Sequence, residues 1–372
     1  MAGWRPKTQI FMSLVYGILE RMTARRWLNL ATIVLMLLIL FLARDDLVKA
    51  WHLLGQVNPW ILLLVLPVQF ISYYAGGAMV FSYLKYKGDL KETSNIEATK
   101  MALELNFVNH VLPSGGVSGI SYMTWRLTKL GVATSRATLA QVVRFAATFG
   151  AFLVLLLLSV LLITFDGDIN RFTILVSCGL IGVIVLGLVV VGYAIGSKSR
   201  IGKLARAVHK AIDWMWHRAL RRKTALPQVV SQVSIQHFFD ELHEDYISLR
   251  RSPDQLKKPL LWGVVFNVSE MALFWVTFLA LGTFVNPAPI MIALGLASLA
   301  GVFLFTPGGA GGYEALMILF LTSAGVPASV AVAGVLLARV LLIVLTIGSG
   351  YLFYHQALKK YGKPDTDGTY RT

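Results

Sequence analysis

Long runs of apolar residues alternate along the chain with shorter segments that carry most of its charges. A helix needs about 20 predominantly apolar residues to cross a bilayer. Six runs reach or approach that length, and each predicts a membrane-spanning helix: 27–43, 60–84, 137–165, 172–195, 259–284 and 326–354. Arg25 and Arg26 precede the first and shortest run, and no small-residue cleavage site follows it. We therefore expect a retained anchor helix there rather than a signal peptide.

Two further apolar segments are shorter and end at proline and glycine clusters. Residues 98–112 lead into PSGGVSG (113–119), and residues 290–305 lead into TPGGAGGYE (306–314). Proline and clustered glycine interrupt a helix. A broken backbone at membrane depth persists only where it is buried in protein or lines a wet cavity. These segments therefore predict two re-entrant helix–loop–helix hairpins.

Lysine and arginine predict how the spans are oriented, because cytoplasmic loops carry an excess of both. Five basic residues precede the first span, and segment 197–258 holds 13 Lys and Arg against 6 Asp and Glu. The loop after the third span contains Asp166 and Asp168, with Arg171 as its only basic residue. We expect both termini in the cytoplasm, with the first hairpin entering from the cytoplasm and the second from outside.

The two hairpin regions repeat each other. With a shift of 194 residues they align without a gap, and nine of the 25 positions over 113–137 are identical. An arginine within a predicted span follows each proline, Arg144 at 31 residues from Pro113 and Arg339 at 32 residues from Pro307. Each half is predicted to consist of two spans, a hairpin and a span, in that order. The two halves run in opposite directions through the membrane. Inverted repeats with interrupted helices are typical of transporters whose site lies near the midplane.

Composition agrees with a membrane protein. The 372 residues are 56% hydrophobic and 14% charged, with a mean hydropathy of +0.67. Soluble domains are about 45–50% apolar and about 25% charged. The net charge of +15 fits cytoplasmic loops that contact anionic lipid, and no nucleic-acid-binding motif is present. Cys178 is the only cysteine, which excludes intrachain disulfides and cysteine-cluster metal sites.

Ionisable residues inside the apolar segments are the candidate binding residues, because such groups usually face a cavity or a partner. They are Arg144, Arg339, Glu314, Glu270 and Glu104. The glycines of the hairpins are further candidates, because free N–H groups at the start of a helix suit an anionic headgroup. They are Gly115, Gly116, Gly309, Gly311 and Gly312. In one interpretation the arginines bind a lipid phosphate and the glutamates an amine or sugar. In the other, the charges are permanent ion pairs that hold the halves together.

The two motifs also resemble a known family. PSGGVSG with the segment from Gly131 to Arg144, and TPGGAGGYE with AGVPASVAVAGVLLAR, are similar to the signature regions of the flippase-like integral membrane family. That family includes the transmembrane region of lysylphosphatidylglycerol synthase. The resemblance implies a bacterial or archaeal inner-membrane protein that moves a lipid between leaflets. Many members have an acidic residue soon after the first glycine break, where this chain has Ser118, Gly119 and Ile120.

We therefore expect an all-α polytopic membrane protein, with six transmembrane helices and two re-entrant hairpins arranged as an inverted repeat. Its expected parts are a cytoplasmic segment (1–26), a first membrane repeat with the fourth span (27–196), a basic helical insert (197–258), a second membrane repeat (259–358) and a polar tail (359–372). A basic amphipathic helix over 201–219 is expected in the insert, lying either on the membrane surface or on the protein's own cytoplasmic face.

The preferred function is movement of an anionic or zwitterionic lipid, including aminoacylated or lipid-linked ones, with no chemical reaction, cofactor or metal. Only a 14-residue polar tail follows residues 355–358, so transferase activity is not expected of this chain. One alternative is the membrane subunit of a lipid-modifying enzyme whose catalytic domain is a separate, soluble transferase chain. Another is an ion or small-solute channel. Membrane lipids are the expected partners, and nucleic acid is not.

Overall fold

The computed structural model describes residues 52, 54–111, 117–166, 171–214, 232–303, 309 and 311–362. Within these ranges the chain is helical, without a strand. The first helices are α4 (Pro59–Leu63), α5 (Val65–Tyr86), α6 (Asn95–Val111), α7 (Val117–Thr128), α8 (Thr134–Asp166) and α9 (Arg171–Ile195). They are followed by α10 (Lys198–Trp214), α11 (Gln232–Arg251), the 3₁₀ turn η3 (Pro253–Leu256), α12 (Lys257–Ala280), α13 (Pro287–Phe303), α14 (Gly312–Ser323) and α15 (Ala328–Tyr361).

Five helical segments in the described ranges are long and apolar enough to cross a membrane. They are Pro59–Tyr86, Thr134–Thr164, Arg171–Ile195, Pro253–Ala280 and Ala328–Tyr361. They coincide with five of the six predicted spans, which are thereby confirmed as long apolar helices. The predicted first span, 27–43, lies outside the described residues. The molecule is an all-helical, multi-pass membrane protein.

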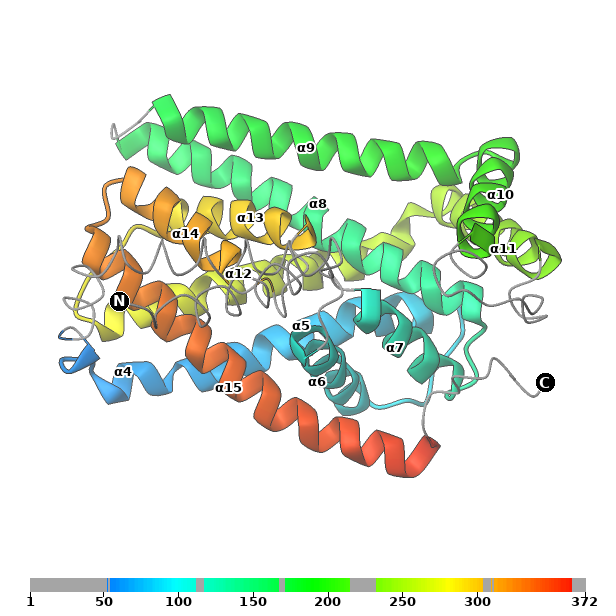
Figure 1. Cartoon of the computed structure of the whole chain (residues 1–372), viewed down its shortest axis with the longest axis horizontal. Coiled ribbons are helices and arrows are strands. Elements are labelled where there is room, and N and C mark those ends of the chain that lie inside the picture. The colour runs from blue at the N-terminus through cyan, green and yellow to red at the C-terminus, as the bar shows by residue number, and fades with distance from the viewer. Residues whose placement is uncertain are drawn as a thin grey trace, which may run out of the picture.

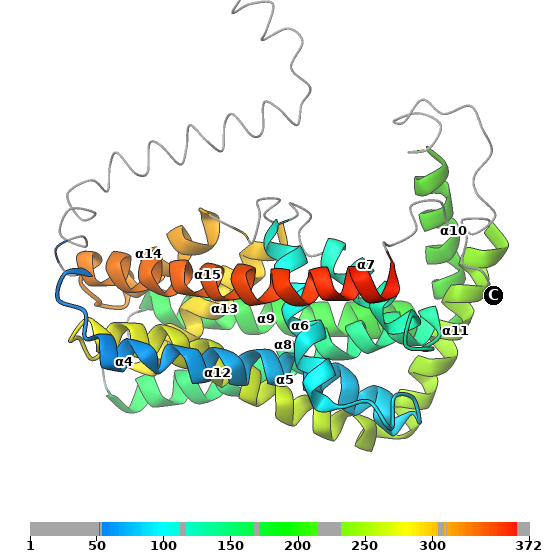
Figure 2. The same cartoon turned by 90° about the horizontal axis from the view of Figure 1, so that it is seen from below.

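The long helices lie roughly along one axis of the molecule, and two pairs of shorter helices pack among them (Figures 1 and 2). One pair is α6 with α7, and the other is α13 with α14. Figure 1 shows the turn from α7 to α8 toward the end of the bundle where α10 and α11 lie, and the turn from α14 to α15 near the opposite end. The segments that connect the two members of each pair are 112–116 and 304–311, and of these the structure describes only Gly309 and Gly311.

Small residues let the helices approach closely at two crossings. A Cβ atom on Gly77 of α5 would lie 2.4 Å from the Ala98 carbonyl oxygen of α6, and one on Gly263 of α12 would lie 2.6 Å from the Ala147 carbonyl oxygen of α8. Close packing of backbones is a main source of helix association in lipid. These contacts fix α5, α6, α8 and α12 around the centre of the molecule.

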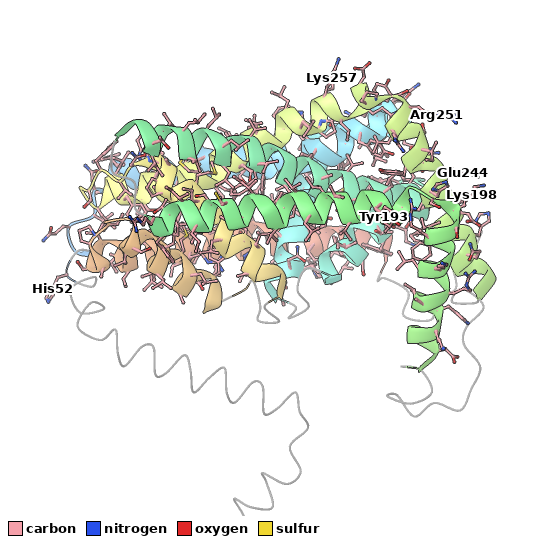
Figure 3. All side chains as sticks on the ribbon, turned by 90° about the horizontal axis from the view of Figure 1, so that it is seen from above. His52, Tyr193, Lys198, Glu244, Arg251 and Lys257 are labelled. Carbon is pink, nitrogen blue, oxygen red and sulfur yellow. The ribbon has the colours of Figure 1, made fainter. Side chains whose placement is uncertain are left out.

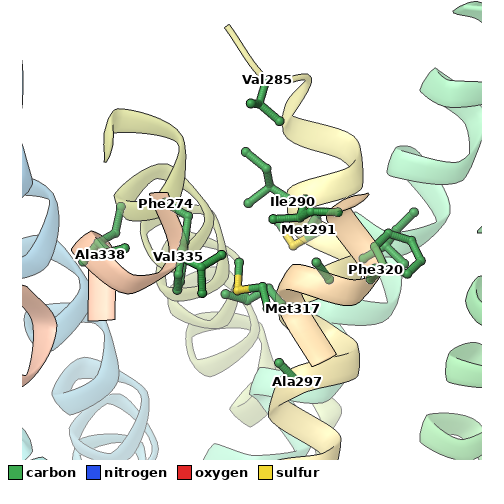
Figure 4. Close-up of a cluster of buried hydrophobic side chains, with 14 of the residues drawn as sticks. Phe274, Val285, Ile290, Met291, Ala297, Met317, Phe320, Val335 and Ala338 are labelled. Carbon is green, nitrogen blue, oxygen red and sulfur yellow. The ribbon is translucent and has the colours of Figure 1, made fainter. Parts of the chain in front are cut away.

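An apolar core joins the second helix pair to the spans on either side of it. Figure 4 shows Met317 of α14 near Phe274 of α12 and Val335 of α15, with Ile290 and Met291 of α13 on the other side. These side chains belong to one buried cluster. Large apolar side chains on α9, in contrast, are exposed, as at Leu175 and Leu186. A soluble protein rarely exposes such a surface, and α9 therefore presents a lipid-facing side.

The helical insert packs against the protein itself where the structure describes it. Ile201 of α10 is fully buried, and it belongs to a cluster with Leu242 and Leu249 of α11 and Ile195 of α9. The His243 imidazole Nδ1 is 2.6 Å from the Ile195 carbonyl oxygen. Figure 3 shows Lys198, Glu244, Arg251 and Lys257 together at this end of the bundle, and His52 at the other. Ile201 and Ala205 of α10 thus pack on the protein itself, as in one of the two interpretations of the sequence, whereas Leu204 of the same helix is 41% exposed.

Ion pairs attach the same insert to the membrane helices. The Asp245 carboxylate lies 3.8 Å from Lys87 Nζ, just after α5, and 3.7 Å from Arg136 Nε of α8. Arg136 also binds Asp89 at 3.1 Å. These contacts join α11 to the ends of two spans.

Candidate functional site

A polar cavity of about 320 Å³ lies in the middle of the helix bundle. Side chains from α5, α6, α8, α9, α12, α13, α14 and α15 line it, so it includes residues of both sequence repeats. Its polar lining residues are Gln69, Ser72, Tyr73, Asn106, His110, Arg144, Thr148, Asn267, Glu270, Ser298, Tyr313, Arg339 and Thr346. Concave sites of this size with a few convergent polar groups are typical binding sites for small ligands or headgroups.

Arg144 supplies a positive charge to this cavity. The helical backbone around it is tied to the neighbouring helix, because Thr148 Oγ1 donates to the Arg144 carbonyl oxygen and Asn267 Nδ2 donates to the Thr148 carbonyl oxygen, at 2.9 and 3.0 Å. The guanidinium carbon lies 4.8 Å from the centre of the Phe145 ring. Its Nε atom is buried and has no hydrogen-bond partner within the part of the chain that the structure describes. Arg144 therefore retains unused donor capacity at the cavity.

Arg339 reaches the same cavity but is neutralised by an ion pair. Its Nε atom lies 2.5 Å from Glu314 Oε1, and both side chains are mostly buried. The other oxygen of Glu314 accepts a hydrogen bond from the Gly311 backbone N–H at 2.7 Å. The guanidinium also lies over the Tyr313 ring, 4.3 Å from its centre. Glu314 thus caps the start of α14 and holds Arg339 of α15 against it.

The two repeats therefore differ in charge where they otherwise correspond. The shift that aligns them brings Glu314 onto Ile120, so the first repeat lacks the carboxylate that pairs with Arg339 in the second. The described residues include no ion pair to Arg144 that would replace it. The departure from the family pattern noted in the sequence thus has a structural counterpart, since Arg144 forms no ion pair with a described residue.

Glu270 is the one carboxyl group among the cavity-lining residues that the structure describes. Ser72 Oγ of α5 donates to Glu270 Oε1 of α12 at 2.5 Å. Tyr73, the next residue, forms a hydrogen bond with the Thr346 hydroxyl of α15. Arg144 and Glu270 together offer a donor fork for a phosphate or carboxylate and an acceptor for an ammonium or hydroxyl group.

Glu104, the remaining ionisable candidate, lies in a separate buried cluster. Its Oε2 accepts from Tyr122 Oη at 2.9 Å and from Arg126 Nε at 3.2 Å. Arg126 also pairs with Glu97 and stacks over Tyr361, 4.2 Å from the ring centre. These contacts join α6 to α7 and to the end of α15. Glu104 does not line the cavity.

The hairpin glycines that the structure describes shape the backbone before α14 and do not line the cavity. Gly309 and Gly311 have positive φ angles of 72° and 90°, and α14 begins at Gly312. None of the three lines the cavity. Gly115 and Gly116 lie outside the described residues. Among the residues described, no group of three His, Cys, Asp or Glu side chains is arranged to hold a metal ion.

Several cavity residues were not selected from the sequence. Ser72, Tyr73, Tyr313 and Thr346 are uncharged residues within apolar segments, where the usual interpretation is helix packing. Gln69 is another such residue, and its Oε1 atom is buried without a hydrogen-bond partner among described residues. The one sequence signal for these positions is their spacing, which places Gln69, Ser72 and Tyr73 on one face of a helix. That spacing does not tell whether the face borders a cavity or a neighbouring helix.

The fold and the cavity define a multi-pass helical membrane protein with polar side chains lining a cavity among its spans. The family model described as the lysylphosphatidylglycerol synthase TM region matches residues 27–350. The chain belongs to this family, as its two glycine-rich motifs predicted. No curated protein matches the chain in a sequence comparison.

Proposed function

We propose that the protein moves an anionic or zwitterionic membrane lipid between the leaflets of a bacterial or archaeal inner membrane, without changing it chemically. The observation that carries this proposal is Arg144, which lines a cavity among the membrane spans and forms no ion pair with any residue that the structure describes. A buried charge without a partner is costly, and a ligand phosphate that binds it offsets that cost. Membership in a family named for a phospholipid synthase supports a lipid as the ligand.

The polar lining gives a headgroup an alternative to water. A lipid headgroup crosses the hydrocarbon core slowly because its charges lose their hydration there. Arg144 replaces water at the phosphate, while Glu270 and the neighbouring hydroxyl groups accept hydrogen bonds from an amine or a sugar. Arg339 is already neutralised by Glu314, so Arg144 is the cation available to the ligand.

The two helix pairs supply the movement in this proposal. We infer that α6 with α7 and α13 with α14 are re-entrant hairpins of an inverted repeat, entering from opposite faces, with both chain termini in the cytoplasm. Rocking of one repeat against the other then opens the cavity to each leaflet in turn. The first predicted span, 27–43, completes the six-span arrangement.

A leaflet assay tests the proposal. The purified protein is reconstituted in vesicles of phosphatidylglycerol and phosphatidylethanolamine that contain a fluorescent phosphatidylglycerol, and dithionite then reports how fast the label changes leaflet. We expect faster exchange than in empty vesicles. Arg144→Gln is expected to slow it at least tenfold, since a charge-assisted hydrogen bond contributes roughly 1.5–3 kcal/mol. Arg144→Lys keeps the charge and is expected to retain part of the rate.

Arg206→Gln is the matched control, because Arg206 is exposed on α10, away from the cavity. It removes the same charge and is expected to leave the rate unchanged. Wild-type protein that exchanges lipid no faster than empty vesicles contradicts the proposal. Equal rates for Arg144→Gln and Arg206→Gln contradict the assignment of Arg144.

The second candidate is the membrane subunit of a lipid-modifying enzyme with a separate soluble transferase. The name of the family favours it, because that name describes the membrane region of a synthase. This candidate predicts that deletion changes the total lipid composition and that a soluble transferase co-purifies. Lipid movement alone predicts unchanged total lipid with an altered leaflet distribution.

A further inference from the structure

A second hollow lies on the flank of the bundle between α5, α6 and α15. It is a groove of about 540 Å³, and its lining is mostly apolar, with Leu66, Phe70, Leu103, Val344, Leu345 and Phe353 among its members. Leu66, Phe70 and Val344 are exposed, so the groove opens to the outside of the bundle. Its wall on α5 extends from Leu66 to Tyr74, a rise of about 12 Å along the helix.

The groove and the polar cavity share a wall. Gln69 and Tyr73 line both. The Tyr73 hydroxyl is hydrogen-bonded to the hydroxyl of Thr346, which lines the cavity only. Gln69 is 3% exposed, and its Oε1 atom has no hydrogen-bond partner in the described part of the chain. The side chains of Gln69 and Tyr73, with the Tyr73–Thr346 hydrogen bond, therefore separate the apolar groove from the polar cavity.

A cation lines the groove beside its apolar surface. Lys100 of α6 belongs to the groove lining, and its Nζ atom lies 5.8 Å from the centre of the Phe353 ring. No carboxylate pairs with Lys100 among the described residues. A groove with an apolar floor and an ammonium group beside it matches a lipid, whose acyl chains are apolar and whose phosphate is negative.

We propose that this groove holds an acyl chain of the lipid whose headgroup enters the polar cavity, and that the Tyr73–Thr346 contact is the gate between the two. This inference rests on the proposed function, and it adds where the tail lies and where the lipid enters. The predicted span 27–43 is another apolar object of suitable size, but it contains no acidic residue to complement Lys100. Charge complementarity therefore favours a phospholipid as the occupant.

Photolabelling tests the inference without depending on transport. The full-length protein is placed in phosphatidylglycerol vesicles that contain a phosphatidylglycerol with a diazirine in its acyl chain, and labelled peptides are identified after irradiation. We expect label concentrated on α5 around Phe70 and on α15 around Val344. Exposed apolar residues of α9, such as Leu175 and Leu186, report contact with bulk lipid. Equal labelling of α9 and the groove overturns the inference.

A glycine in the groove offers a position from which a larger side chain can fill the space. Gly348 lines the groove, and a Cβ atom built on it meets nothing within 4 Å. Gly348→Phe is therefore expected to occupy the groove, remove most of the groove label and slow lipid exchange severalfold. Gly187→Phe on α9 is the matched control, because Gly187 is also in a span with nothing within 4 Å of its Cβ position.

The outcomes separate this inference from the proposed function. Groove labelling that Gly348→Phe abolishes, in a protein that exchanges no lipid, supports the tail site and contradicts lipid movement. Lipid exchange by a protein in which Gly348→Phe and Gly187→Phe behave alike overturns the tail site and leaves the proposed function standing. A disulfide between cysteines introduced at position 348 and within 27–43, in a Cys178→Ala background, identifies that segment as the occupant and also overturns it.

Discussion

At the scale of single residues, the two repeated arginines have different electrostatic roles. Arg339 is held by Glu314, whose carboxylate also caps α14. Arg144 has an isoleucine where that carboxylate would lie in the aligned repeat. The two interpretations that the sequence left open therefore each fit one arginine. The ion pair with Glu314 fits permanent pairing for Arg339, and the proposed function uses Arg144 as the cation that binds the ligand.

Glu314→Gln tests the structural part of that distinction. The substitution keeps the shape and an acceptor for the Gly311 N–H, but it leaves the Arg339 guanidinium buried without its counter-ion. Removing one partner of a buried pair costs on the order of 3 kcal/mol. We therefore expect the melting temperature of the detergent-purified protein to fall by several degrees.

Glu244→Gln serves as the control for this prediction, because Glu244 pairs with Lys198 at 3.8 Å while both side chains are 69% exposed. Exposed pairs contribute about 0–1 kcal/mol, so its melting temperature is expected to match the wild type. If both substitutions shift the melting temperature equally, the Glu314–Arg339 pair does not stabilise the protein.

The residues of the site were predictable from sequence mainly where they carry charge. Arg144, Arg339 and Glu270 attract notice because ionisable groups inside spans are rare, and all three line the cavity. Glu104 has the same signal, yet its partner Arg126 lies 22 residues away on α7. Only the folded α6–α7 pair reveals that contact. Tyr73 and Gln69 carry no charge, and their role depends on which face of α5 borders the cavity.

At the scale of helices, most of the architecture follows from hydropathy and from the proline and glycine breaks. Each of the five spans in the described ranges begins and ends within seven residues of its apolar run. Bilayer thickness sets the length of such runs, so they need no tertiary information. Helix crossings are different, because they depend on small residues whose partners are distant in the sequence. Gly263 against Ala147 is such a case.

Gly263→Val is expected to separate α8 from α12. Its Cβ atom would lie 2.6 Å from a backbone oxygen that has no rotamer to change, and overpacking of this kind costs about 1–3 kcal/mol. The neighbouring bond from Asn267 to Thr148 is expected to break as the helices part. Loss of the monodisperse peak in fluorescence-detected size-exclusion chromatography, or a lower melting temperature, measures the effect.

Gly179→Val on α9 provides the comparison, because a Cβ atom there meets nothing within 4 Å. Both substitutions place valine in a membrane-spanning helix, so the difference between them isolates the contact with α8. Indistinguishable elution profiles and melting temperatures would contradict the packing argument.

At the scale of the whole molecule, function depends on how the two helix pairs are oriented in the membrane. The positive-inside rule and the 194-residue repeat predict opposite orientations, and Figure 1 shows their connections to α8 and α15 toward opposite ends of the bundle. A cavity between oppositely inserted hairpins is accessible from each face in turn. Two hairpins inserted from one face leave the other leaflet without an equivalent opening.

Cysteine accessibility measures this orientation directly. Lys129 follows α7 and Thr322 lies near the end of α14, and both are exposed. In a Cys178→Ala background, a membrane-impermeant maleimide is expected to label Thr322→Cys in intact cells, and Lys129→Cys only after permeabilisation. The reason is that the predicted topology returns the first pair to the cytoplasmic side and the second pair to the opposite side. Labelling of both cysteines from the same side would contradict the inverted repeat and, with it, alternating access to the cavity.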